Sequence, residues 1–101
     1  MGIVYSVTVK PDQDIEQDYV KWLQEEHIQE VVATGCFDDF RLFKVLAEDE
    51  RDGSSYNIQY TTTEMTRYFD YINIYAPLMS SKGKEKFGDK FHAFRTVLKQ
   101  L

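Results

Sequence analysis

Residues 2–10 read GIVYSVTVK, and the alternation in this stretch decides the fold. Every second side chain is apolar, and most of the side chains between them are polar. A period of two that is rich in β-branched residues predicts a strand with one buried face. The residues expected on that buried face are Ile3, Tyr5, Val7 and Val9.

A helix and two further strands are expected after this strand. Residues 13–33 have apolar side chains three or four positions apart, which is typical of a helix that faces a sheet. Residues 36–47 are dense in Phe, Leu and Val, and residues 55–61 alternate cleanly. The charged residues 48–54 between these two strands predict a hairpin loop.

A second helix and a last strand complete the pattern. The helix is expected to begin near Met65 and to end at Gly88. Proline cannot continue a helix comfortably, so we expect a kink or a fresh start at Pro77. Residues 90–100 predict the fourth strand.

The order strand, helix, strand, strand, helix, strand uses nearly all of the 101 residues. It predicts a single domain over residues 1–101 with a ferredoxin-like α+β fold, in which two helices cover one face of a four-stranded antiparallel sheet. The other face of such a sheet is uncovered. We therefore expect a homodimer in which the two sheets stack or close into a barrel.

The two faces of the sheet carry different side chains. Besides the buried row of the first strand, the set expected to face the helices is Phe40, Leu42, Leu46, Tyr56, Ile58, Tyr60, Phe94 and Leu98. The set expected on the open face includes Ser6, Thr8, Arg41, Phe43, Asn57, Gln59, Ala93, Arg95 and Val97. This mixed face suits a dimer interface around a polar cavity, because buried polar groups need partners. Alternatively, Arg41 forms an ion pair with Asp39 or with an acid of the second copy.

Composition narrows the classes of partner. The net charge of −5 argues against nucleic acid and anionic membranes as partners. Residues 1–52 carry a net charge of −8 and residues 53–101 a net charge of +3, which indicates either two solvated faces or contact between two copies. A single cysteine, Cys36, fits a reducing cytoplasm, and no apolar run approaches the ~20 residues that span a bilayer.

The most suggestive group of titratable residues is Glu25-Glu26-His27-Ile28-Gln29-Glu30. On a regular helical wheel, Glu26 and Glu30 lie within the apolar stripe and His27 lies at its margin. A desolvated Glu or His has a shifted pKa, which makes His27 and Glu30 candidate catalytic bases. Alternatively, the helix leaves the sheet here and the two acids point to solvent or meet Arg41 or Arg95.

Aromatic side chains near this segment would suit the walls of a pocket for a flat ligand, although aromatic side chains more often belong to the core. The candidate ligand-binding residues are Tyr19, Trp22, Glu26, His27, Arg41, Gln59 and Arg95. His92 of the last strand is expected to face the helices. We expect no metal, because the His, Cys and Glu residues lack a metal-ligand spacing, and no cofactor, because nucleotide-binding motifs are missing. The lysines from Lys82 to Lys90 form a basic patch that is either a solvated helix face or a site for an acidic partner.

The sequence also resembles a small bacterial family of unknown function. The resemblance lies in Trp22-Leu23, His27-Ile28, Glu30-Val31 and Thr34-Gly35-Cys36-Phe37, and in the stretch from Phe87-Gly88 to Phe94-Arg95-Thr96-Val97-Leu98. More loosely, the chain is similar to the dimeric α/β-barrel superfamily. That resemblance implies a homodimer with a small-molecule pocket between sheet and helices. It leaves open a ligand-binding protein, a cofactor-free monooxygenase or isomerase, and a regulatory interaction module.

Overall fold

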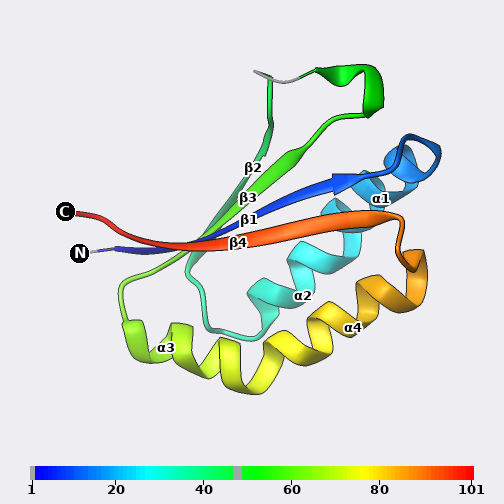
Figure 1. Cartoon of the computed structure of the whole chain (residues 1–101). Helices are drawn as coiled ribbons and strands as arrows, with labels where there is room; N and C mark the ends of the chain where they lie inside the picture. The colour runs from blue at the N-terminus through cyan, green and yellow to red at the C-terminus, as the bar shows by residue number, and fades with distance from the viewer. Residues whose placement is uncertain (1, 47–48) are drawn as a thin grey trace.

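A computed structural model describes residues 2–46 and 49–101 of the chain. Strands β1 (Ile3–Pro11), β2 (Asp39–Lys44), β3 (Tyr56–Thr62) and β4 (Phe91–Lys99) form one antiparallel sheet in the order β2-β3-β1-β4. The two long helical segments lie on one side of this sheet (Figure 1). This arrangement confirms the predicted ferredoxin-like α+β fold.

Each of the two long helical segments contains a π-helical turn. The first segment is η1 (Gln13–Ile15), α1 (Glu16–Trp22), the π turn η2 (Leu23–His27) and α2 (Ile28–Ala33). The second is α3 (Met65–Asp70), the π turn η4 (Tyr71–Tyr75) and α4 (Ala76–Phe87). A short 3-10 turn, η3 (Glu50–Asp52), lies between β2 and β3.

The π turn η2 changes which side chains face the sheet. In a π turn, residues five apart lie above one another, so Ile28 follows Leu23 on the buried side, and each is 1% exposed. The sequence prediction assumed regular α-helical turns and placed Glu26 and Glu30 on the apolar stripe. That placement is wrong: Glu26 is exposed and Glu30 is half-buried.

The second helical segment continues past its proline without a break. Helix α4 begins at Ala76, directly after the π turn η4, and Pro77 is its second residue. The expected fresh start is therefore not observed; instead, a π turn, which interrupts the regular hydrogen bonds of the α-helix, lies directly before the proline. Gly88 ends the helix with a positive φ of 62°, a conformation that favours glycine.

The register of β4 reverses the predicted faces of that strand. Arg95 pairs with Val7 of the buried row of β1, so it shares the helix-facing side of the sheet. The residues of β4 that face the helices are Phe91, Ala93, Arg95 and Val97. Those that face away are His92, Phe94, Thr96 and Leu98. The prediction for this strand, including His92, is wrong because apolar residues occur on both of its sides.

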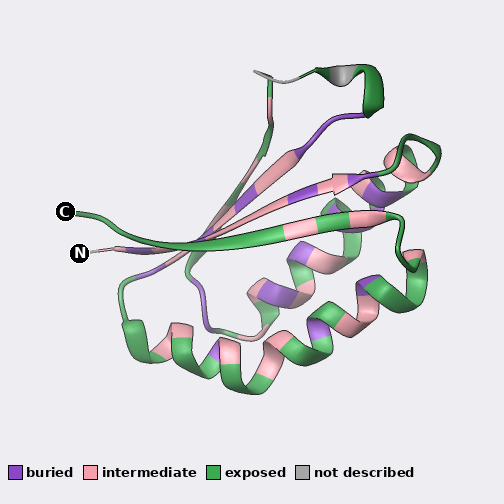
Figure 2. Ribbon diagram, viewed as in Figure 1, coloured by how far each residue is buried: buried purple, intermediate pink, exposed green. Residues whose placement is uncertain are grey.

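The core lies where the helices meet the sheet (Figure 2). Tyr5, Ile58 and Tyr60 of the central strands are at most 3% exposed, as their alternation predicts. Strand β2 is shorter than expected, and Leu46, placed in the core by the sequence pattern, lies beyond it and is 79% exposed. Cys36 is a buried free thiol that follows the end of α2.

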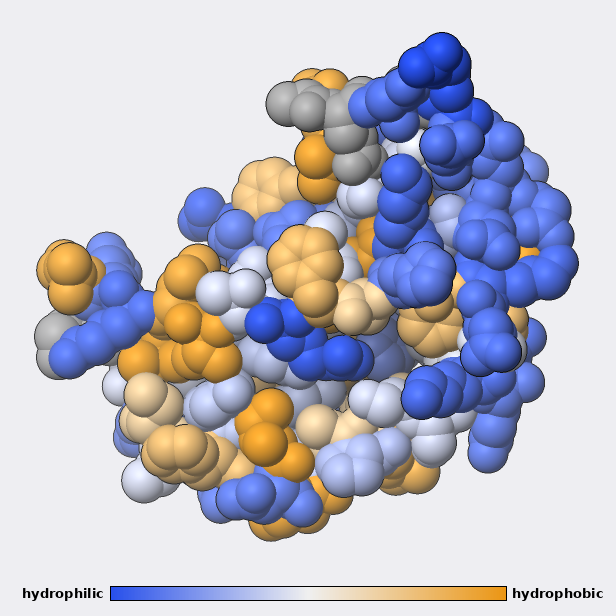
Figure 3. Space-filling model, in the orientation of Figure 1, coloured by the Kyte–Doolittle hydropathy of each residue, from blue (hydrophilic) through white to orange (hydrophobic). Residues whose placement is uncertain are grey.

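Apolar side chains also reach the surface at the end of the molecule where α3 and the last residues of β4 lie (Figure 3). Met65 and Phe69 of α3 and Val97 and Leu98 of β4 are each between 40% and 53% exposed. Hydrophilic residues cover the opposite end, which is formed by α1 and the β2–β3 hairpin. Exposed apolar surface of this kind is typical of interaction sites.

Truncation of the core residue that follows the π turn tests this packing. We expect Ile28→Ala to lower the free energy of unfolding by about 2–5 kcal/mol, because the side chain is fully enclosed. The matched variant Ile74→Ala, at a position that is 63% exposed, is expected to change it by less than about 0.5 kcal/mol. Urea denaturation of both variants measures the difference, and equal losses would contradict the buried position of Ile28.

Candidate functional site

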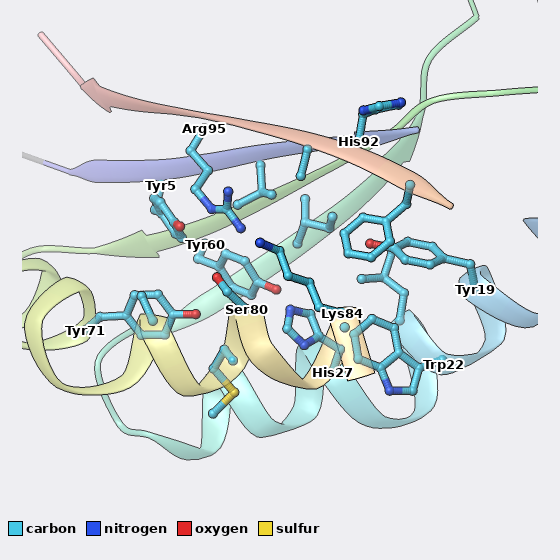
Figure 4. A pocket seen from close by; sticks show the side chains of 18 of the residues that line it. Tyr5, Tyr19, Trp22, His27, Tyr60, Tyr71, Ser80, Lys84, His92 and Arg95 are labelled. Carbon is cyan, nitrogen blue, oxygen red and sulfur yellow. The ribbon is translucent and has the colours of Figure 1, made fainter. Parts of the chain in front are cut away.

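A cavity of about 510 Å³ lies between the sheet and the helices. Its volume falls within the range of ligand pockets in proteins. Its walls are largely aromatic, and polar groups lie among them (Figure 4). The aromatic lining residues are Tyr5, Tyr19, Trp22, Tyr60, Tyr71 and Phe91, and the polar side chains are His27, Ser80, Lys84, Asp89 and Arg95. His92 borders the cavity from β4, but its side chain points away from it.

Ring contacts fix one wall of the cavity. The Tyr19 ring lies 5.6 Å from the Trp22 ring and 5.2 Å from the Phe91 ring, centroid to centroid. The His27 ring stacks on Trp22 at 4.6 Å, with 24° between the ring planes. Aromatic contacts at these distances restrict ring motion, so the imidazole is held in one orientation.

Gly83 allows α4 to approach this wall. A Cβ atom at this position would lie 3.2 Å from Cζ of Phe91 and 3.5 Å from Cη2 of Trp22. The first distance is tighter than an ordinary carbon contact, so a larger side chain would push α4 away from β4. The glycine thereby sets how closely the two sides of the cavity approach each other.

His27 is the unusual polar group of the cavity. Its Nδ1 atom is buried and has no hydrogen-bond partner among the described residues. Burial lowers the pKa of His27 to about 4; Arg95 and Lys82 lower this pKa as well, and Glu30 raises it. The imidazole is therefore neutral at pH 7, with one nitrogen that lacks its usual bond.

The tyrosine hydroxyls of the cavity are neutral too. Burial raises the pKa of Tyr60 and of Tyr71, so both phenols stay protonated at physiological pH. Burial also raises the pKa of Tyr5, and a hydrogen bond and the positive charge of Arg95 partly oppose this effect. The site therefore offers hydroxyl donors.

Ion pairs join the two helical segments beside the cavity. Lys86 lies 3.5 Å from Glu26, and Lys82 pairs with Glu30. The two acids are four residues apart, and so are the two lysines. The two ion pairs therefore lie one helical turn apart and connect helices that run in opposite directions. The acidic and basic parts of the sequence thus meet within one chain, as they also do where Lys90 pairs with Asp14.

Four of the seven predicted ligand-binding residues line the cavity: Tyr19, Trp22, His27 and Arg95. Glu26 lies outside it, at the ion pair with Lys86. Arg41 and Gln59 pair with each other across β2 and β3 on the open face of the sheet, so the structure does not bring them together with the other four. Of the two candidate bases, His27 lines the cavity and Glu30 does not.

Sequence reasoning missed Lys84 and Ser80, which line the cavity from α4. Lys84 was counted with the basic patch from Lys82 to Lys90. A helical wheel would have separated it, because Lys82 and Lys86 fall on one side of α4 and Lys84 on the other. Ser80 carried no signal, since a lone serine in a helix is common.

Among the described residues, no three His, Cys, Asp or Glu side chains are grouped in a way that would hold a metal ion. None of the helices in residues 2–46 and 49–101 has the length and apolar character needed to cross a membrane.

A model of a protein family described as a domain of unknown function (DUF4286) matches residues 2–101. The chain belongs to the DUF4286 family. This assignment confirms the resemblance to a family without a known activity. None of the curated proteins matches the DUF4286 chain.

Solved structures share the fold of this DUF4286 domain. An EthD family protein of Bacillus halodurans C-125 has a TM-score of 0.71 at 9% identity, covering 98% of this chain and 99% of that one. A mutant form of SnoaB of Streptomyces nogalater, a cofactor-independent oxygenase, has 0.65 at 11% identity, covering 97% and 92%. A dimeric ferredoxin-like protein of unknown function from Jannaschia sp. CCS1 has 0.60 at 12% identity, covering 95% and 98%. At these identities the likeness shows the fold alone.

The burial of His27 predicts a pH-dependent stability. Its pKa is about 4 in the folded domain and ~6.5 when unfolded, so unfolding takes up a proton between these values. The contribution to stability is present above pH 6.5 and is lost as pH falls through 4, by up to roughly 3 kcal/mol. We expect His27→Gln to remove this part of the pH dependence in urea denaturation between pH 4 and 7.

The other histidine supplies the control. His92 is exposed on the open face of the sheet, and His92→Gln is expected to keep the pH dependence of the parent. If His27→Gln and His92→Gln followed the same pH profile as the parent, the imidazole of His27 would not be desolvated in solution.

Proposed function

We propose that this domain is a homodimeric protein that binds a small organic molecule between its sheet and its helices. The observation that carries the proposal is the cavity of about 510 Å³, whose walls are aromatic and include the neutral imidazole of His27. The rings or chains of a bound molecule fill the apolar part of the cavity, and the polar side chains of the wall pair with its hydrogen-bonding groups.

The lining of the cavity suits an organic molecule. Small-molecule pockets of this size combine apolar and aromatic walls with a few polar groups that fix the orientation of the ligand. Here the walls are largely aromatic, and His27, Tyr60 and Tyr71 are neutral polar groups among them.

A second candidate is a cofactor-free oxygenase or isomerase that uses His27 as a base. The observation in its favour is that the imidazole of His27 lines the cavity. However, the pKa of about 4 makes this imidazole a weak base at neutral pH, and bases act best with a pKa near the working pH. Binding without chemistry therefore remains the first proposal.

The third possibility, an interaction module that uses the basic patch from Lys82 to Lys90, receives less support. Lys82, Lys86 and Lys90 already form ion pairs with acids of the first helical segment. An acidic partner would have to displace these contacts.

A retained ligand is expected in native mass spectra of the purified protein, as an added mass of one small organic molecule for each chain. Ser80 lines the cavity from an exposed position on α4, so Ser80→Phe is expected to lower the occupied fraction at least fivefold. The matched variant Glu85→Phe, on the same helix but outside the cavity, is expected to retain the adduct. Equal occupancy in both variants would place the bound molecule elsewhere.

The open face of the sheet supports the dimer. Phe43, Phe94 and Leu98 on this face are between 45% and 65% exposed. The side-chain amide of Asn57 donates hydrogen bonds to the hydroxyls of Ser6 at 2.9 Å and Thr8 at 3.0 Å. Because these polar groups are already paired, a second sheet can cover them without leaving them unsatisfied.

A charge on the open face is expected to separate the two copies. Phe94→Glu would bury a carboxylate without a partner in the dimer, so we expect a mainly monomeric protein in sedimentation experiments at concentrations where the parent is dimeric. The matched variant Ile74→Glu, at an exposed position of the second helical segment, is expected to remain dimeric. A monomeric parent would remove the dimer from the proposal.

A further inference from the structure

Two positive charges meet over the cavity. Figure 4 shows Lys84 reaching in from α4 and Arg95 from β4, and the charged ends of both side chains lie over the same space. Neither residue forms an ion pair among the residues that the structure describes. Like charges directed at one space repel each other, and this repulsion is strongest beside apolar walls.

The position of Lys84 follows from the packing of α4. Lys82 and Lys86 face the first helical segment, where Glu30 and Glu26 neutralise them. Lys84 lies two residues from each of them, about 200° around the helix, and so points to the opposite side. The ion pairs of Lys82 and Lys86 with the first helical segment therefore orient Lys84 toward the cavity.

The position of Arg95 follows from the register of β4. Its pairing with Val7 places it on the helix-facing side of the sheet. Burial raises the pKa of Tyr5, Tyr19 and Tyr71, and the positive charge of Arg95 partly opposes this rise. The guanidinium therefore acts on several polar groups of the site, which it lines from β4.

The acids near the cavity do not neutralise this pair. Asp89 lines the cavity beside Gly88, but it has no ion pair with Lys84 or Arg95. Glu30 is held by Lys82, outside the cavity. The tyrosine hydroxyls and His27 are neutral groups, so the side chains that reach into the cavity from α4 and β4 leave it positively charged.

We propose that the cavity binds a small planar aromatic acid, with its ring between Trp22, Tyr60 and Tyr71 and its anionic group held by Lys84 and Arg95. This inference rests on the proposed ligand-binding function and names the class of ligand. Hydrogen bonds from two cations to one carboxylate are charge-assisted and roughly twice as strong as neutral ones. The aromatic walls favour a flat ring over an aliphatic chain or a sugar.

Two probes of nearly equal shape test whether the ligand is an aromatic acid. 1-Naphthoate carries a carboxylate, and 1-naphthamide has nearly the same shape without a charge. We expect isothermal titration calorimetry of the full chain to show that the acid binds at least tenfold more tightly than the amide. The Ser80→Phe variant is expected to bind neither probe, which places the binding in the cavity.

Matched variants assign the preference to the two cations. Arg95→Gln and Lys84→Gln are each expected to weaken 1-naphthoate binding about tenfold and to change 1-naphthamide binding less than twofold. Arg41→Gln on the open face of the sheet and Lys86→Gln at the ion pair with Glu26 are the controls, and both are expected to bind the acid as the parent does.

The outcomes separate this inference from the proposed function. If acid and amide bind equally, or if the Arg95 and Lys84 variants bind the acid as tightly as the parent does, the anionic class is wrong but the cavity still binds a ligand. If neither probe binds and native mass spectra show no retained molecule, both the class and the proposed function are wrong.

Discussion

The insertion of one residue at the π turn Leu23–His27 is the constraint on which the site depends. Without it, regular α-helical turns would place Glu26 and Glu30 toward the sheet, where their charges would lack partners. With it, Ile28 takes the buried position after Leu23, and the two acids meet Lys86 and Lys82 of α4. π turns occur often at functional sites, and both π turns of this chain contribute residues to the cavity wall.

The cavity lies between the sheet and the helices, which contact each other through large aromatic side chains. The Tyr5 ring contacts those of Phe37 and Tyr71, with centroids 5.9 and 5.5 Å away, so aromatic side chains separate the helices from the sheet. At the other end, Gly83 brings α4 against Trp22 and Phe91. The space is thus supported by stiff residues on one side and narrowed by a glycine on the other. A cavity supported in this way keeps its shape without a ligand, which reduces the entropic cost of binding.

Sequence reasoning reached most of the fold and part of the site. Strands β1 and β3 could be predicted because apolar and polar residues alternate in them. Gly88 marked the end of α4, because glycine readily adopts the positive φ that this position requires. The faces of β4 were not accessible, because Phe94 and Val97 make both sides of the strand apolar and only pairing with β1 decides between them. The π turn was not accessible either, since nothing in the composition of Leu23–His27 distinguishes it from an α-helical turn. Trp22 and His27 could be found because an aromatic and a titratable side chain beside an apolar stripe stand out in the sequence. Lys84 could not, because its position depends on which residues face its neighbours Lys82 and Lys86.

The strand order has a consequence for how the chain reaches this structure. β1 lies between β3 and β4, so both of its hydrogen-bonded edges wait for segments that are synthesised much later. Pairing of the first strand with the last one closes a loop of most of the 101 residues, which slows folding. During synthesis on the ribosome, the apolar row of β1 remains without its sheet partners until β3 and then β4 have emerged. Until then, this apolar row is exposed surface through which one nascent chain can associate with another.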